Sequence, residues 1–132
     1  MSFCTAINCM DGRVQLPVIN YLRERFGVEY VDSVTEAGPN RIVGLQSDTA
    51  LLDSILDRVK RSVKFHDPAG LAIVAHHDCL GNPVDKIVQF EELELAAKYL
   101  TEQFGEIPVI GLWVDETWTV SEEFTHIPKN DK

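Results

Sequence analysis

The stretch 71-LAIVAHHDCLG-81 decides the fold of this 132-residue chain. It opens with an uninterrupted apolar run, which two histidines, an aspartate, a cysteine and a glycine close. A short apolar run of this kind is typical of a buried parallel strand, and open α/β sheets carry their chemistry at the carboxyl ends of such strands. His76 and Cys79 are both good zinc ligands. The stretch therefore predicts a central strand that ends at a candidate metal site.

A second apolar run with metal-binding residues after it lies near the start of the sequence. Residues 3–8, FCTAIN, predict a first central strand, and Cys9 stands just past it. If this strand lies beside the strand of residues 71–75, Cys9 can supply a third ligand. Two thiolates and one neutral imidazole cancel the charge of a zinc dication and leave one coordination place open.

Helical and strand patterns alternate along the rest of the chain. Apolar periodicity and capping residues predict helices at 16–26, at 48–64 after an N-cap at Ser47, and at 86–104 after an N-cap at Asp85. Further strands are expected at 29–35 and 109–114, with an edge strand or extended arm within 115–127. Residues 36–39 are expected to form a loop, and no element is assigned to 40–46.

This alternation predicts an α/β fold with a central, mainly parallel sheet of four to five strands and helices on both faces. We expect a single domain over residues 1–132, in which residues 129–132 form a frayed tail.

The composition excludes several kinds of partner. The net charge is −9 and the basic residues are scattered, which disfavours nucleic acid and anionic membranes. No apolar run approaches the roughly 20 residues that span a bilayer, and the first residues lack the pattern of a signal peptide. We therefore expect a cytoplasmic protein with no nucleic-acid or membrane partner. Three cysteines in such a chain predict reduced thiols rather than a disulfide framework.

Two charged residues near Cys9 are expected to decide whether the fourth coordination position of the metal is open. Asp11 could take that place or stand just outside it, and Arg13 can hold a carboxylate in a bidentate fork. With Asp11 on Arg13, the fourth ligand can be water, whose pKa zinc lowers until hydroxide is available. With Asp11 on the zinc, the site is closed. We expect these two residues to form a switch between active and resting states.

The pattern Cys9-x-Asp11-x-Arg13 followed by His76-x-x-Cys79 resembles the β-class carbonic anhydrases, of which this chain looks like a short, divergent member. Glu36-Ala37-Gly38 and the late strand that ends at Asp115 are also similar to strand-end sequences of that family. The sequence differs from the family pattern at Gly12, where a serine is common, and at Leu80, which separates Cys79 from a glycine.

The resemblance implies a β-carbonic-anhydrase-like fold and a zinc ion held by Cys9, His76 and Cys79. It implies catalytic roles for Asp11, which orients or replaces zinc-bound hydroxide, and for Arg13, which holds Asp11. The implied reaction is the reversible hydration of carbon dioxide to bicarbonate by metal-bound hydroxide, the reaction of a carbonate dehydratase, a lyase. The family also implies a homodimer or a larger homo-oligomer.

Three alternatives remain open at this point. The same site could hydrolyse carbon disulfide or carbonyl sulfide, or the chain could be a noncatalytic zinc-binding domain in which Asp11 closes the metal. A cysteine-dependent phosphatase or sulfurtransferase would use Cys9 as nucleophile and Arg13 to bind an oxyanion. A phosphatase loop needs five residues between them; this chain has three, one of them acidic, which disfavours this alternative.

The remaining reactive or aromatic residues have structural interpretations. Cys4 is expected to be a core thiol and His77 to face solvent or a neighbour. Asp78 is expected to stabilise its loop as an acceptor or to support the metal ligands from outside the coordination sphere. The run that contains Glu91, Glu92 and Glu94 predicts a solvated helix face. Three late aromatic residues are expected to pack in the core or an interface rather than bind substrate: Trp113, Trp118 and Phe124.

Overall fold

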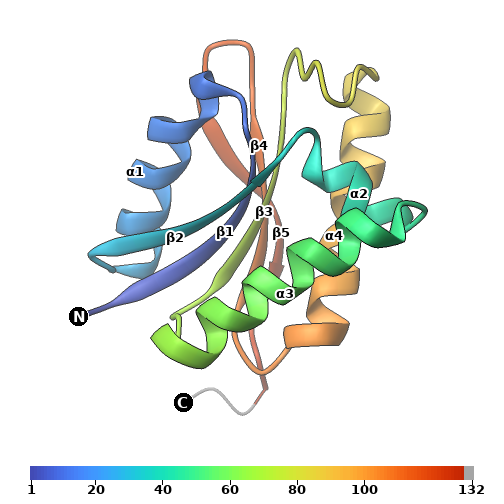
Figure 1. Ribbon diagram of the computed structural model, residues 1–132. Coiled ribbons are helices and arrows are strands. Elements are labelled where there is room, and N and C mark those ends of the chain that lie inside the picture. Colours follow the sequence, from blue (N-terminus) through green and yellow to red (C-terminus); the bar gives the residue numbers. More distant parts are fainter. Residues whose placement is uncertain (130–132) are drawn as a thin grey trace.

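A computed structural model describes residues 1–129 of the chain and shows one five-stranded sheet (Figure 1). The strand order is β2-β1-β3-β4-β5. Four strands are parallel: β1 (Phe3–Cys9), β2 (Tyr30–Glu36), β3 (Leu71–His76) and β4 (Val109–Val114). The edge strand β5 (Val120–His126) runs antiparallel to β4. The predicted α/β class is confirmed, and residues 130–132 of the predicted tail lie outside the described residues.

Helices cover both faces of the sheet, as predicted (Figure 1). The short 3-10 helix η1 (Gly12–Val14) leads into α1 (Gln15–Phe26), which covers one face. The other face carries three helices: α2 (Pro39–Leu45), α3 (Thr49–His66) and α4 (Lys86–Phe104).

Each face of the sheet has its own buried apolar cluster. Strand residues alternate between the two, so Ile73 packs with α2, α3 and α4, whereas Val74 packs with α1. Both clusters consist mainly of aliphatic side chains that are almost fully buried. All six residues of β3 are buried, which explains its continuous apolar run, because a central parallel strand is covered on both faces.

Most predicted helix ends agree with the structure. Gly27 follows α1 in the left-handed conformation (φ 63°), and Asp85 caps α4 by accepting a hydrogen bond from the Val88 N–H at 3.0 Å. The predicted cap of α3 at Ser47 is wrong. Asp48 caps this helix instead, with its carboxylate accepting from the Leu51 N–H at 3.1 Å.

Helix α2 was not predicted. It starts at Pro39, directly after Gly38 in the left-handed conformation (φ 64°), and spans 7 residues. So short a helix carries little periodicity of its own, and it is stabilised by packing on α4. A Cβ on Gly44 would lie 2.6 Å from the Glu92 carbonyl oxygen, so the two helices approach closely there. Within the described residues, no helix combines the length and the apolar character needed to cross a membrane.

Candidate metal centre

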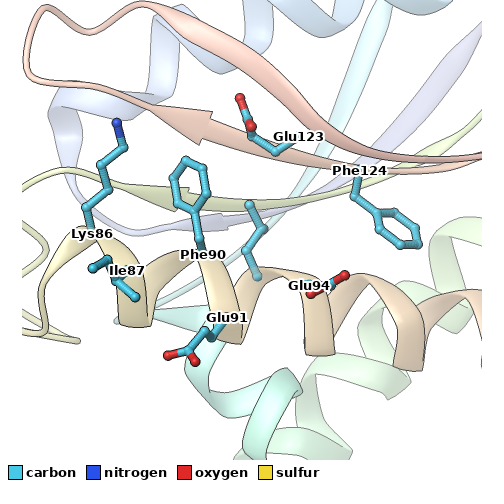
Figure 2. Close-up of a pocket in the computed structure, with 8 residues that line it drawn as sticks. Lys86, Ile87, Phe90, Glu91, Glu94, Glu123 and Phe124 are labelled. Carbon is cyan, nitrogen blue, oxygen red and sulfur yellow. The ribbon is translucent and has the colours of Figure 1, made fainter.

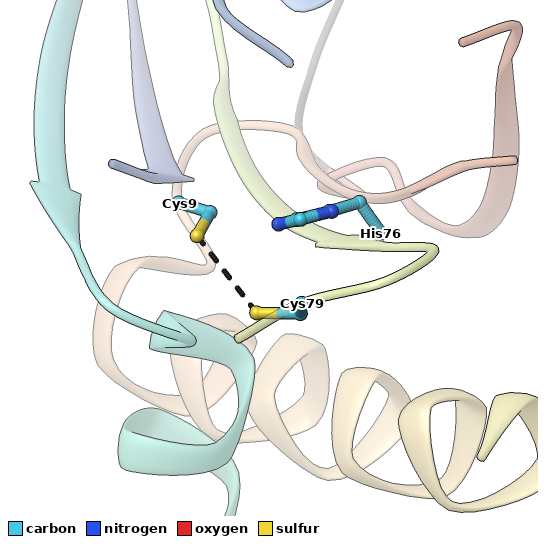
Figure 3. Close-up of side chains that lie close together, drawn as sticks. All are labelled: Cys9, His76 and Cys79. Atoms are coloured by element: carbon cyan, nitrogen blue, oxygen red, sulfur yellow. Dashed lines mark hydrogen bonds between the residues drawn. The ribbon is translucent and has the colours of Figure 1, made fainter. Parts of the chain in front are cut away.

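The candidate ligands lie at the carboxyl ends of two neighbouring strands. β1 pairs with β3 in parallel, with Ile7 opposite Ile73, so the predicted neighbour relation is confirmed. Cys9 is the last residue of β1, His76 is the last residue of β3, and Cys79 follows in the next turn. Figure 3 shows the three side chains pointing toward one another from these segments.

The distances within this cluster suit a single metal ion. The Sγ atoms of Cys9 and Cys79 are 3.8 Å apart, and one ligand atom from each of the three residues lies within 4.8 Å of the others. All three residues are buried. Thiolate and imidazole are the donors that zinc sites use most, so the donor set and its spacing fit zinc.

The orientation of His76 also fits a metal. Its Nδ1 lies 2.7 Å from the backbone carbonyl oxygen of His77, which can only accept, so Nδ1 carries the proton. The lone pair of the neutral ring is then on Nε2. This buried atom has no hydrogen-bond partner within residues 1–129. Histidine ligands are commonly oriented by such a bond from the other ring nitrogen.

The electrostatics of the cluster favour a cation. A hydrogen bond with Cys79 lowers the pKa of Cys9, and the same contact raises the pKa of Cys79, because two adjacent thiolates repel each other. Burial lowers the pKa of His76, but the nearby Cys9 thiolate and the His77 carbonyl outweigh it and raise that pKa overall. A dication held by the cluster would neutralise both thiolates together.

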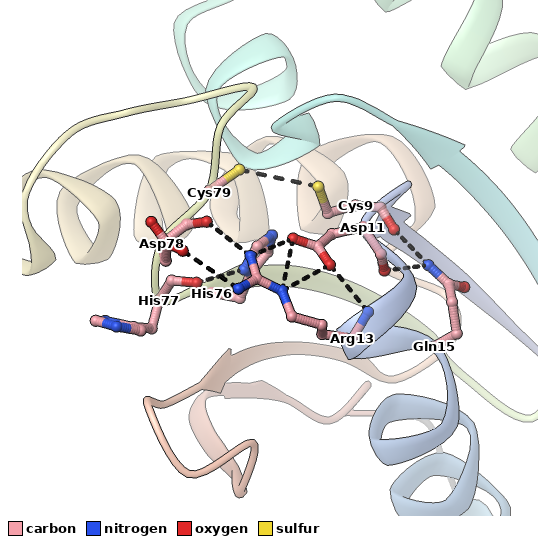
Figure 4. Close-up of polar contacts among 8 residues, drawn as sticks. All are labelled: Cys9, Asp11, Arg13, Gln15, His76, His77, Asp78 and Cys79. Atoms are coloured by element: carbon pink, nitrogen blue, oxygen red, sulfur yellow. Dashed lines mark hydrogen bonds and ion pairs between the residues drawn. The ribbon is translucent and has the colours of Figure 1, made fainter.

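Asp11 and Arg13 form the predicted pair at the edge of this cluster (Figure 4). The Arg13 Nη2 lies 2.7 Å from Asp11 Oδ2 and its Nε lies 3.1 Å from Oδ1, so the fork is bidentate. The backbone N–H of Arg13 also donates to Asp11 Oδ1 at 2.9 Å. These contacts with Arg13 lower the pKa of the Asp11 carboxyl to about 2 and raise the pKa of the guanidinium.

Two residues far along the chain also hold Arg13. Its Nη1 pairs with Asp78 Oδ2 at 3.2 Å, and its Nη2 donates to the backbone carbonyl of Asp78, also at 3.2 Å. The Trp118 ring lies over the guanidinium, with 4.6 Å between the Cζ atom and the ring centroid. Asp78 is thus an acceptor, as predicted. Trp118 packs against the apolar cluster beneath α1, as expected, but its contact with Arg13 was not predicted, and no signal in its own segment points to Arg13.

Polar side chains fix the loop between Cys9 and α1. Gln15 Nε2 donates to the backbone carbonyls of Cys9 at 2.7 Å and of Asp11 at 2.9 Å. On the strand side, the buried Asn8 accepts from the Cys9 N–H at 2.8 Å and donates to the Val14 carbonyl at 3.2 Å. Cys9 and Asp11 are therefore held on a loop that is hydrogen-bonded at both ends.

The loop after Cys79 packs against the end of β2. A Cβ on Gly38 would lie 2.7 Å from the Asn82 Cβ, so only a glycine lets the two segments approach this closely. Glu36 anchors the β2 side through an ion pair with Arg58 of α3. Leu80, where the sequence differs from the family pattern, points into solvent with 84% of its surface exposed. Leu80 therefore alters only the rim of the site, and Cys79 remains inside the cluster.

A buried polar network supports this loop from α4. Asn82 Nδ2 donates to Glu92 at 2.6 Å, and Gln89 Nε2 donates to the Asn82 carbonyl at 2.8 Å. Gln89 in turn accepts from Asn40 of α2 at 2.9 Å. The prediction that Glu92 belongs to a solvated face is wrong, because packing of α2 on α4 leaves it only 5% exposed. Its neighbours Glu91 and Glu94 are exposed as expected.

A pocket of about 400 Å³ adjoins the cluster on the β3 side. Its lining includes His76 and Cys79 of the cluster, and its other walls are partly apolar through Leu80, Val84 and Trp113. A small uncharged molecule that enters this pocket comes next to two of the three candidate ligands.

A second pocket, of about 520 Å³, lies between α4 and β5 (Figure 2). Phe90 and Phe124 line it, with Glu94 and Glu123 among its charged residues, and no member of the cluster contributes to it. Lys86 lines both pockets. The second pocket is larger but is not the candidate site, because it holds none of the candidate ligands.

The other reactive residues have the predicted surroundings. Cys4 is fully buried, and burial, with a smaller effect of Asp32, raises the pKa of its thiol to about 12. His77 is exposed, and its ring points away from Arg13 (Figure 4). Trp113 is a core residue with an edge contact to Phe90, at 5.1 Å between ring centroids.

Known proteins resemble this chain in sequence and in fold. Residues 1–123 match the family model described as "Putative carbonic anhydrase". A search of proteins with curated functions found no significant match. Among solved structures, a carbonic anhydrase from Glaciozyma antarctica is 14% identical with a TM-score of 0.57, covering 89% of this chain and 80% of that chain.

Two other solved structures are similar. One is from a study of two tetrameric β-carbonic anhydrases of Sordaria macrospora, with 11% identity, a TM-score of 0.55, and coverage of 90% of this chain and 79% of that chain. The other is a β-carbonic anhydrase of Aspergillus fumigatus, with 15% identity, a TM-score of 0.52, and coverage of 91% and 74%. At these identities the likeness is one of fold.

Proposed function

The chain belongs to the carbonic anhydrase family, and from that premise we propose that it is a zinc-dependent carbonate dehydratase, which interconverts carbon dioxide and bicarbonate. The observation that carries the proposal is the buried Cys9, His76 and Cys79 cluster, with its ligand atoms within 4.8 Å of one another and the Asp11–Arg13 pair beside it.

Zinc is the metal that this donor set suits best. Two thiolates and one imidazole are soft and borderline ligands, which zinc prefers and which magnesium and calcium disfavour. When bound, zinc supplies a Lewis acid that lowers the pKa of water and makes a nucleophile available at mild pH. The chain contributes the arrangement of groups around that chemistry.

We assign to Asp11 the task of orienting the attacking water by accepting a hydrogen bond from it. Arg13 keeps the carboxylate available for this task, because its bidentate fork fixes both oxygens of Asp11. The pairing of Asp11 with Arg13 supports a catalytic site over a noncatalytic domain in which Asp11 closes the metal. The partly apolar pocket beside His76 suits carbon dioxide, which is uncharged and weakly polar.

We also propose that the chain assembles into a homo-oligomer. Support comes from the tetramers named for the Sordaria macrospora enzymes and from large apolar side chains exposed at the carboxyl edge of the sheet, among them Met10, Leu16, Leu80 and Ile87. Such side chains at one edge are typical of an interaction surface. Light scattering coupled to size-exclusion chromatography should give a mass above that of a monomer.

Stopped-flow hydration of carbon dioxide by the zinc-loaded protein tests the proposed activity. We expect the wild type to hydrate carbon dioxide faster than the buffer alone does. Asp11→Ala and Cys79→Ala should each abolish this catalysis. Carbonyl sulfide and carbon disulfide are assayed alongside. Turnover of either without hydration of carbon dioxide would show that this molecule, rather than carbon dioxide, is the substrate. Inactivity toward all three would refute the enzymatic function.

A further inference from the structure

Trp118 has an unusual backbone conformation in the turn between β4 and β5. Its φ is 60°, in the left-handed region that bulky side chains rarely adopt. The turn is held there by Asp115, whose Oδ1 accepts from the Thr117 N–H at 2.9 Å and from the Thr119 N–H at 3.0 Å. The Trp118 N–H donates to the Asp115 carbonyl at 3.0 Å. A strained residue fixed by this many bonds suggests that its side-chain position has a use.

That side chain lies over Arg13. The indole is partly buried against the apolar cluster beneath α1, and its ring lies 4.6 Å from the guanidinium carbon. A guanidinium over an indole face is held by cation–π attraction and by stacking of two flat groups. The turn and the left-handed backbone of Trp118 thus place a flat apolar surface against the residue that holds Asp11.

Two carboxylates compete for the guanidinium of Arg13. Asp11 accepts from Nε and Nη2, and Asp78 accepts from Nη1. The Arg13 side chain is 43% exposed and that of Asp78 is 57% exposed, so neither is fixed by burial. Without the indole, the guanidinium could follow Asp78 into solvent, and Asp11 would lose its partner.

We propose that Trp118 is a positioning residue, which keeps Arg13 on Asp11 and thereby keeps the Asp11 carboxylate from binding a metal held by Cys9, His76 and Cys79. This inference rests on the proposed zinc site. It assigns to the β4–β5 turn a part in setting how often the metal is open to small molecules.

The test measures access to the metal independently of turnover. Cobalt(II) replaces zinc, and azide is titrated while the visible d–d absorption bands are followed. Azide shifts these bands only where a coordination position is open to it. The full chain is used as wild type, Trp118→Gly and Trp118→Phe. Glycine removes the indole and also relieves the left-handed strain, whereas phenylalanine keeps an aromatic face over Arg13.

We expect Trp118→Gly to raise the dissociation constant for azide about two- to fivefold, the range for losing an exposed cation–π contact. Trp118→Phe should recover most of the affinity. Tyr21→Phe is the matched control, because it removes a 2.9 Å hydrogen bond between α1 and Glu122 of β5 without touching Arg13. Its azide affinity should equal that of the wild type.

Unchanged azide affinity in Trp118→Gly would overturn the inference, as would an equal loss in Tyr21→Phe, which would indicate general loosening. A wild type that binds no cobalt would overturn both the inference and the proposed function. If azide binding depends on Trp118 but carbon dioxide is not hydrated, the inference stands and the proposed function fails.

Discussion

The backbone of Gly81 lies against Ala37, so closely that a Cβ on Gly81 would be 2.6 Å from the Ala37 Cβ. This contact joins the loop after Cys79 to the loop after β2. Gly81→Ala should push the two loops apart, move Cys79 within the cluster and cost about 1–3 kcal/mol of stability, as overpacking does. Urea unfolding and zinc affinity measure the two effects.

Gly12→Ala is the matched control for this substitution. Gly12 lies near Cys9 as Gly81 lies near Cys79, but a Cβ there would meet nothing within 4 Å. Its stability should stay within about 0.5 kcal/mol of the wild type. Equal losses in the two variants would contradict the close approach of Gly81 and Ala37.

The metal ligands can be tested by zinc content. Cys9→Ser, His76→Ala and Cys79→Ala should each lower bound zinc well below about one ion per chain after dialysis, because three protein donors are needed to hold it. Elemental analysis gives the ratio. Cys4→Ala removes a cysteine that is also buried in β1 but lies outside the cluster, so its zinc content should not change. If Cys4→Ala lost its zinc while the three ligand variants kept theirs, the zinc site could not be the Cys9, His76 and Cys79 cluster.

Arg13→Ala separates metal binding from catalysis. Zinc content should stay at the wild-type level, whereas hydration of carbon dioxide should fall about 10- to 100-fold, the effect of losing hydrogen bonds to a charged group. The reason is that Asp11 is then free to bind the metal. Arg61→Ala, which breaks an exposed ion pair with Asp57 on α3, is the control and should leave both quantities unchanged. An Arg13→Ala protein with full activity would refute the assigned roles.

The buried thiol of Cys4 predicts a pH dependence of stability. Burial raises its pKa from 9.0 to about 12, so between these values the unfolded chain releases a proton that the folded chain keeps. The free energy of unfolding should therefore fall as pH rises through this window, by up to about 1.4 kcal/mol per pH unit from this group. Below pH 9 the contribution is constant.

Cys4→Ala lacks this titrating group, so its stability should decline less steeply at alkaline pH. Urea unfolding of both proteins at a series of pH values from 7 to 10.5 gives the comparison. Parallel curves for the wild type and the variant would show that Cys4 ionises in the folded chain as easily as in the unfolded chain.

The sequence was sufficient for the parts of the fold that depend on local patterns. The apolar runs of β1 and β3 and the long amphipathic stretches of α3 and α4 have strong periodicity, and their positions agree with the structure to within two residues. The grouping of Cys9, His76 and Cys79 was also predictable, because the carboxyl ends of neighbouring parallel strands meet at one edge.

What the sequence did not predict depends on contacts between distant segments. Helix α2 forms where packing on α4 stabilises seven residues without strong periodicity. Glu92 is buried by that same packing, although its acidic neighbours had indicated a solvated helix face. The indole of Trp118 reaches Arg13 only because the chain turns back between β4 and β5. None of these contacts leaves a local signature.

Cys9 and Cys79 are separated by 70 positions in the sequence, yet their sulfur atoms are neighbours once β1 and β3 pair. An emerging chain cannot bring these donors together until residue 79 has left the ribosome and the first and third strands have joined. An ion that binds only this late arrangement stabilises the folded chain by mass action. With zinc bound as proposed, loss of the metal would lower the stability of the folded chain as well as its proposed activity.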